Sequence, residues 1–198
     1  MRLANVAGAV KSESAMKLFG QMYGEHRAKA NAARYEMVAE GFVKTFGDKE
    51  FDFFTSPGRT EIGGNHTDHN HGKVLAGSVH LDCVAAAAPN GTRKVTLISE
   101  TYNQHLVIDL DHLEPTEKTT GTEPLLKGIF AGLLKSGYKV EGFDAYTTSN
   151  VIGGAGVSSS AAFEMLVCVI VDHLFNQGNI GVVAYAKAGQ YAENKKNL

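Results

Sequence analysis

A glycine- and serine-rich stretch, Ile152–Ala162, combines residue types that hold phosphate groups in many proteins. It places Gly153, Gly154 and Gly156 directly ahead of Ser158–Ser160. Glycine lets the backbone turn through angles that other residues avoid, and it leaves main-chain N–H groups open to an anion. Apolar residues then recur at helical spacing, so the positive end of a helix points back at the loop. These helical positions are Phe163, Leu166, Val167, Ile170 and Leu174.

Two common nucleotide-binding patterns do not fit this loop. A Walker-type loop needs a lysine before its serine or threonine, and this loop has none. The dinucleotide pattern needs a third glycine where Ser159 stands, and the nearest suitable acidic residue, Asp172, falls inside the following helix. Taken alone, the loop is better explained as a tight strand-to-helix connection with serine caps, so it needs support from elsewhere in the chain.

A second stretch, Pro57–Gly72, concentrates three of the eight histidines beside an arginine and four glycines. Three interpretations are open: a metal site, a solvated turn, and a site that binds sugar hydroxyls. A metal site is disfavoured because ligands this close along the chain rarely converge on one ion. The residues competent to bind such a metal are His66, Asp68, His69 and His71.

In the hydroxyl-binding interpretation, each polar residue has a distinct task. Asp68 accepts hydrogen bonds from two hydroxyl groups, and Asn65 and His66 contact a third. Arg59 supplies a fixed positive charge.

The pattern of the whole chain predicts an α+β protein with a helical lead-in over residues 1–50 and one larger domain over 51–198. We expect Ser56-Pro57-Gly58 to close the first strand, and Pro89-Asn90-Gly91 to join two strands in a hairpin. The expected helices are 12–23, 28–46, 122–136, 160–175 and 180–195, and the expected strands are 51–55, 77–88, 95–99, 105–110 and 142–150.

Composition limits the classes of function. Of the 198 residues, 43% are hydrophobic and 20% charged, and the formal net charge is -2. This balance argues against nucleic acid or an anionic membrane as the main partner, and favours a small molecule. We find no apolar stretch of the length that a membrane span requires and no signal sequence, and we expect a cytoplasmic protein. Cys83 and Cys168 are expected to be reduced core residues.

With both stretches considered together, the sequence resembles a known family. Pro57–Gly72 is similar to the signature of galactokinases. Gly153–Ala162 resembles the phosphate loop shared by galactokinase, homoserine, mevalonate and phosphomevalonate kinases, and Gln190–Asn194 resembles a third, weaker motif. The resemblance implies a kinase that moves the γ-phosphoryl group of ATP to the anomeric hydroxyl of galactose, with Mg²⁺ as cofactor. It also implies an N-terminal domain of this kinase superfamily with an unusual left-handed β-α-β unit.

The resemblance also implies roles for single residues. Arg59 matches the active-site arginine between sugar and phosphate, and Ser160 with Glu193 matches the pair that holds Mg²⁺. The sugar-contacting positions are Asn65, His66 and Asp68. The cradle for the triphosphate comprises Gly153, Gly154, Ala155, Gly156, Val157, Ser158, Ser159 and Ser160.

Several departures from the family pattern bear on function. Asn65 stands where galactokinases have Glu, and His69 where they have Tyr, which leaves open a related sugar such as N-acetylgalactosamine. In the family a Met-Asp-Gln segment beyond the third motif supplies a catalytic aspartate, and this chain stops before it. We therefore expect an N-terminal portion that lacks the C-terminal domain, exposes apolar faces on its last two helices and is inactive alone. A non-catalytic sensor of galactose and ATP is the rival hypothesis.

Overall fold

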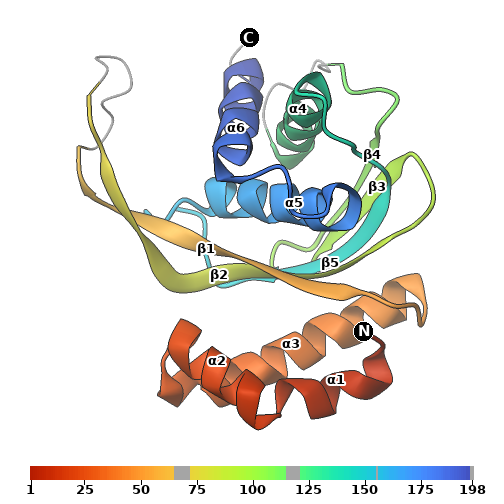
Figure 1. The fold of residues 1–198 in the computed structure, drawn as a ribbon, viewed down its shortest axis with the longest axis vertical. Coiled ribbons are helices and arrows are strands. Elements are labelled where there is room, and N and C mark those ends of the chain that lie inside the picture. Colours follow the sequence, from red (N-terminus) through yellow and green to blue (C-terminus); the bar gives the residue numbers. More distant parts are fainter. Residues whose placement is uncertain (65–71, 115–120, 155, 197–198) are drawn as a thin grey trace.

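The computed structural model describes residues 1–64, 72–114, 121–154 and 156–196 (Figure 1). The elements in chain order are α1 (Leu3–Val10), α2 (Glu13–Tyr23), α3 (Glu25–Phe46), β1 (Asp52–Gly63), β2 (Leu75–Pro89), β3 (Lys94–Ser99), β4 (Gln104–Asp109), α4 (Thr122–Lys135), β5 (Phe143–Ser149), α5 (Ser159–Asn176) and α6 (Val182–Lys196).

Within the described residues, a five-stranded sheet separates two groups of helices. Its strand order is β1-β2-β5-β3-β4. Neighbouring strands pair antiparallel except β3 and β5, which are parallel. Figure 1 shows α1, α2 and α3 on one face of the sheet, and α4, α5 and α6 on the other. The predicted α+β class is confirmed, whereas the left-handed unit stays a prediction.

Strand β2 forms part of both hydrophobic cores. Successive side chains of a strand point to opposite faces of the sheet. Cys83, Ala85 and Ala87 accordingly join the core beneath α4, α5 and α6. Val84, Ala86 and Ala88 join the core above α1, α2 and α3. Because both faces are covered, this part of β2 is apolar at every position from 83 to 88 rather than at alternate ones.

The first strand is longer than predicted. Ser56-Pro57-Gly58 does not close it, because β1 continues to Gly63. Its pairing with β2 shifts between Pro57 and Arg59, where Pro57 lies opposite Asp82 and Arg59 opposite Ser78. Proline lacks an N–H donor and is tolerated at bulges and in edge strands, and β1 is an edge strand of this sheet. The apparent turn signal is therefore a bulge.

The predicted hairpin between β2 and β3 is wrong. The turn itself forms, with Gly91 at a φ of 69°. However, β5 lies between the two strands, and Gly142 ahead of β5 exchanges backbone hydrogen bonds with Asn90 (3.2 Å) and Thr92 (2.9 Å). Turn chemistry is local, so it could not reveal that β3 pairs with β5 rather than with β2.

The predicted helices are present with small shifts of their ends, and the sequence pattern missed α1. Helix α5 is, by length and composition alone, apolar enough to cross a membrane, contrary to our expectation. It is instead packed on the sheet, with Leu166, Val167 and Ile170 fully buried. Its apolar residues are buried or half-buried, so the expectation of an exposed apolar face is wrong for α5. At the start of α6, Val182 and Val183 are exposed.

Candidate functional site

The glycine loop connects β5 to α5, and Ser158 at its end does not cap the helix. Gly154 and Gly156 adopt positive φ angles of 81° and 74°, as their proposed role in a turning loop requires. Ser158, the residue before the helix, is left-handed and its side chain makes no capping hydrogen bond. The serine-cap interpretation is therefore wrong for Ser158. The first turn of α5 presents backbone N–H groups and the positive end of its dipole without a cap from this residue.

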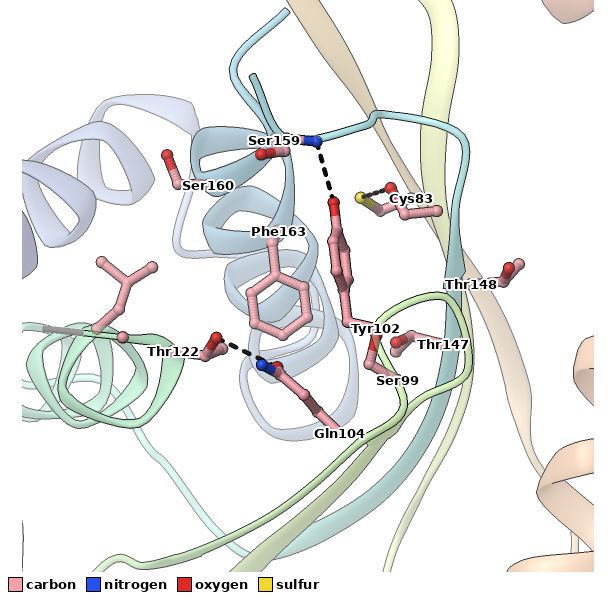
Figure 2. Close-up of a pocket in the computed structure, with 14 residues that line it drawn as sticks. Cys83, Ser99, Tyr102, Gln104, Thr122, Thr147, Thr148, Ser159, Ser160 and Phe163 are labelled. Atoms are coloured by element: carbon pink, nitrogen blue, oxygen red, sulfur yellow. Dashed lines mark hydrogen bonds between the residues drawn. The ribbon is translucent and has the colours of Figure 1, made fainter. Parts of the chain in front are cut away.

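A cavity of about 330 Å³ opens beside this loop. Figure 2 shows the rings of Tyr102 and Phe163 in its wall, with Ser159 and Ser160 at the helix end. The wall thus combines apolar ring faces with hydroxyl groups and a helix N-terminus. The lining residues are Cys83, Ser99, Tyr102, Gln104, Gly121, Thr122, Leu125, Thr147, Thr148, Ser149, Gly153, Ser159, Ser160 and Phe163.

Tyr102 links the cavity wall to the glycine loop. Its hydroxyl accepts a hydrogen bond from the Gly153 N–H and donates one to the Val151 carbonyl, both at 3.2 Å. Gly153 was predicted to offer its N–H to phosphate, and that N–H is instead directed at Tyr102. Sequence reasoning missed Tyr102, because a tyrosine in a turn between two strands has no spacing that marks it.

The two sequence motifs lie side by side. The Arg59 N–H donates to the Val157 carbonyl at 3.1 Å, so β1 is joined directly to the glycine loop. Gly58 makes this approach possible, since a Cβ there would lie 2.8 Å from the Val157 carbonyl oxygen. The Arg59 side chain is 45% exposed and its guanidinium lies 3.3 Å from a carboxylate oxygen of Glu61. The backbone of Arg59 thus contacts the loop, whereas its guanidinium is paired with Glu61.

The predicted magnesium ligands lie on two helices that pack together. Gly189 of α6 lies against Glu164 of α5, where a Cβ would be 2.7 Å from a Glu164 carboxylate oxygen. Ser160 and Glu193 each lie one helical turn from this contact. In the described residues no group of three or more His, Cys, Asp or Glu side chains is arranged to hold a metal ion. A hydroxyl and a carboxylate are donors that suit Mg²⁺, which keeps several of its ligands as water or phosphate oxygens.

Part of the predicted site lies outside the described residues. This applies to the sugar-contacting positions Asn65, His66 and Asp68, and to Ala155 of the cradle. The other histidines of the cluster, His69 and His71, also fall there, so the metal and solvated-turn interpretations of that stretch stay open.

A buried polar cluster supports the site from the opposite face of the sheet. Asp82 is 3% exposed, and its carboxylate accepts hydrogen bonds from Arg34, Thr55 and Tyr23, the last at 2.6 Å. Burial raises the pKa of the Tyr23 phenol, as do Tyr35 and Asp82 beside it. The backbone carbonyl of Asp82 also accepts from the Asn150 N–H at 2.9 Å. The cluster thus ties α2 and α3 to the strands that carry both motifs.

Comparisons with known proteins show which proteins this chain resembles. The model of the family described as "Galactokinase galactose-binding signature" matches residues 40–89. The galactokinase of Lactococcus lactis subsp. lactis is 35% identical over 168 residues, which are 83% of this chain and 42% of that protein. The galactokinase of Clostridium tetani is 32% identical over 153 residues, 77% of this chain and 39% of that protein. The chain therefore spans about two fifths of the length of these curated relatives.

Two solved structures are similar to this chain in fold. The crystal structure of Lactococcus lactis galactokinase complexed with galactose superposes with a TM-score of 0.74 at 33% identity, covering 83% of this chain and 42% of that one. A mevalonate kinase structure has a TM-score of 0.58 at 16% identity, covering 74% and 47%. The second likeness shows the fold alone.

Proposed function

Since this chain corresponds in sequence and fold to the N-terminal portion of galactokinases, we propose that it forms the ATP- and sugar-binding part of a galactokinase-type enzyme. The reaction is transfer of the γ-phosphoryl group of ATP to the anomeric hydroxyl of galactose. We place the protein in the cytoplasm, with ATP and Mg²⁺ as cofactors and a small sugar as substrate.

The observation that carries this proposal is the contact between the two motifs. The hydrogen bond from the Arg59 backbone N–H to the Val157 carbonyl joins β1, which carries the sugar signature, to the loop proposed to bind phosphate. In phosphoryl transfer the protein mainly positions the reactants and stabilises developing negative charge. We assign that task to the Arg59 guanidinium, whose strand contacts the loop through its backbone.

The cavity suits the nucleoside part of ATP. Its volume of about 330 Å³ lies in the range typical of small-molecule sites. The rings of Tyr102 and Phe163 offer apolar faces to a base, whereas the loop and the start of α5 offer N–H groups to the phosphates. Ser160 and Glu193 are the proposed ligands of Mg²⁺, which neutralises phosphate charge when bound. Asn65, His66 and Asp68 are the proposed sugar contacts.

Calorimetric titration tests the proposal. MgATP and galactose should each bind to the chain, and Asp68→Asn should abolish galactose binding while leaving MgATP binding unchanged. Titration with N-acetylgalactosamine and glucose then tests the choice of sugar, because the Asn65 amide both donates and accepts where a carboxylate only accepts. Absence of binding for every sugar and for MgATP would refute the proposal. Galactose preference that is unchanged by Asn65→Glu would refute the role of Asn65.

A further inference from the structure

The turn between β3 and β4, residues 100–103, holds the end of β5 through several hydrogen bonds. The Glu100 N–H donates to the Thr147 carbonyl at 2.9 Å. The Thr101 hydroxyl accepts from the Ser149 N–H at 2.8 Å and lies 3.1 Å from the Thr148 hydroxyl. These contacts fix β5 up to its last residue, Ser149, shortly before the glycine loop.

Tyr102 extends this attachment into the loop itself. Its single hydroxyl bridges the carbonyl of Val151 and the N–H of Gly153, two residues apart. Figure 2 shows the ring rising from the turn toward the loop, with the dashed line to the Gly153 nitrogen at its tip. One end of this bridge is anchored, because Val151 is fully buried, whereas Gly153 is exposed.

Burial of the tyrosine itself does not explain this geometry. Tyr102 is 47% exposed, so its packing contributes less than that of a core aromatic residue. The hydroxyl instead fixes the positions of two backbone groups, the Val151 carbonyl and the Gly153 N–H. They lie immediately before Gly154, where the loop turns with a φ of 81°. The orientation of the later N–H groups depends on that starting point.

We propose that the Tyr102 hydroxyl is a positioning group for the glycine loop. It fixes Val151–Gly153 so that the N–H groups that follow, together with the start of α5, are directed at the phosphates of a nucleotide. This inference rests on the proposed function for the identity of the ligand, but the fixing of the loop is a property of the free chain. Tyr102 acts through the loop and takes no part in the chemical step.

Tyr102→Phe is the direct test because it removes the hydroxyl and keeps the ring. Tyr138→Phe is the matched control, since the Tyr138 hydroxyl also contacts a backbone carbonyl, that of Ile180, at 3.5 Å, and Tyr138 does not line the cavity. Hydrogen exchange of the ligand-free chain should be faster at the Gly153 amide in Tyr102→Phe and unchanged in the control.

The same variants are titrated with MgATP and with adenosine. Loss of one hydrogen bond predicts about 3- to 10-fold weaker MgATP binding by Tyr102→Phe, whereas adenosine, which has no phosphate, should bind as to the natural chain. Equal or tighter MgATP binding by Tyr102→Phe would overturn the inference, as would unchanged exchange at Gly153. If the natural chain binds neither ligand, the proposed function fails, and the exchange measurement alone decides whether the hydroxyl fixes the loop.

Discussion

At the scale of single residues, Gly58 determines how closely β1 approaches the glycine loop. Gly58→Ala would place a methyl group 2.8 Å from the Val157 carbonyl oxygen and 3.1 Å from a methyl group of Val151. Neither neighbour is the end of a long flexible side chain, so we expect a loss of about 1–3 kcal/mol in the free energy of unfolding. Gly63→Ala in the same strand is the control, because nothing lies within 4 Å of its Cβ. Equal stability of the two variants in urea unfolding would contradict this close approach.

The cysteines give a second prediction at this scale. Both are free and buried, as the sequence indicated. Burial, together with the nearby carboxylates of Glu164 and Asp172, raises the pKa of the Cys168 thiol to about 12. At pH 8 the thiol is therefore almost entirely protonated and a poor nucleophile.

A Cys83→Ser variant leaves Cys168 as the sole thiol of the chain. In the native state at pH 8 this thiol should react with a disulfide reagent far more slowly than a free cysteine, and in denaturant it should react at the ordinary rate. Fast reaction without denaturant would show that α5 opens, or that it is not packed as described.

At the residue scale, the sequence indicated candidate positions through their chemical groups and did not indicate the residues that hold the backbone. Arg59 and the glycines were identifiable because guanidinium charge and missing side chains have direct chemical meaning. Tyr102 and Asp82 were not, because their importance arises only from hydrogen bonds to segments far away in the sequence.

At the scale of elements, the close packing of α4 against α6 sets the position of the helix that carries Glu193. Gly128 of α4 lies against Ala192 of α6, and a Cβ at Gly128 would be 2.7 Å from the Ala192 Cα. In an isolated helix, replacing Gly by Ala is stabilising by up to about 1 kcal/mol. Here the clash reverses the sign, and we expect Gly128→Ala to be destabilising by about 1–3 kcal/mol.

Gly8→Ala in α1 is the control for helix propensity. Gly8 is exposed, and nothing lies within 4 Å of its Cβ, so this variant should be more stable than the natural chain by about 0.5–1 kcal/mol. Thermal and urea unfolding of both variants measure the difference. If Gly128→Ala were as stable as Gly8→Ala, the described contact between α4 and α6 would be wrong.

The elements themselves were largely predictable, and their pairing was not. Helices α2 to α6 follow from apolar periodicity, and Gly47 and Gly137 mark the ends of α3 and α4. The position of β5 between β2 and β3 depends on contacts between strands that are far apart in the sequence. Local sequence patterns do not predict such contacts. The bulge in β1 was read as a turn because proline and glycine favour both structures.

At the scale of the whole molecule, the N-terminal helices belong to the architecture of the site. Residues of α1, α2 and α3 share a hydrophobic core with β1 and β2. The Asp82 cluster joins α2 and α3 to β1, the strand that carries Arg59. The predicted division of the chain at residue 50 therefore separates segments that pack closely. We propose that this helical layer holds the edge strand β1 in place, since an edge strand has only one neighbour in the sheet.

We propose that Arg59 and the glycine loop form one site for the transferred phosphoryl group. The most direct test compares the affinities of the chain for ATP and ADP, both with Mg²⁺, before and after Arg59→Ala. A guanidinium beside the γ-phosphate predicts about 10-fold or greater loss for ATP and a clearly smaller loss for ADP. Arg93→Ala is the control, because Arg93 pairs with Asp111 at the other end of β3, and it should change neither affinity. Equal losses for ATP and ADP, or no loss for either, would contradict the claim.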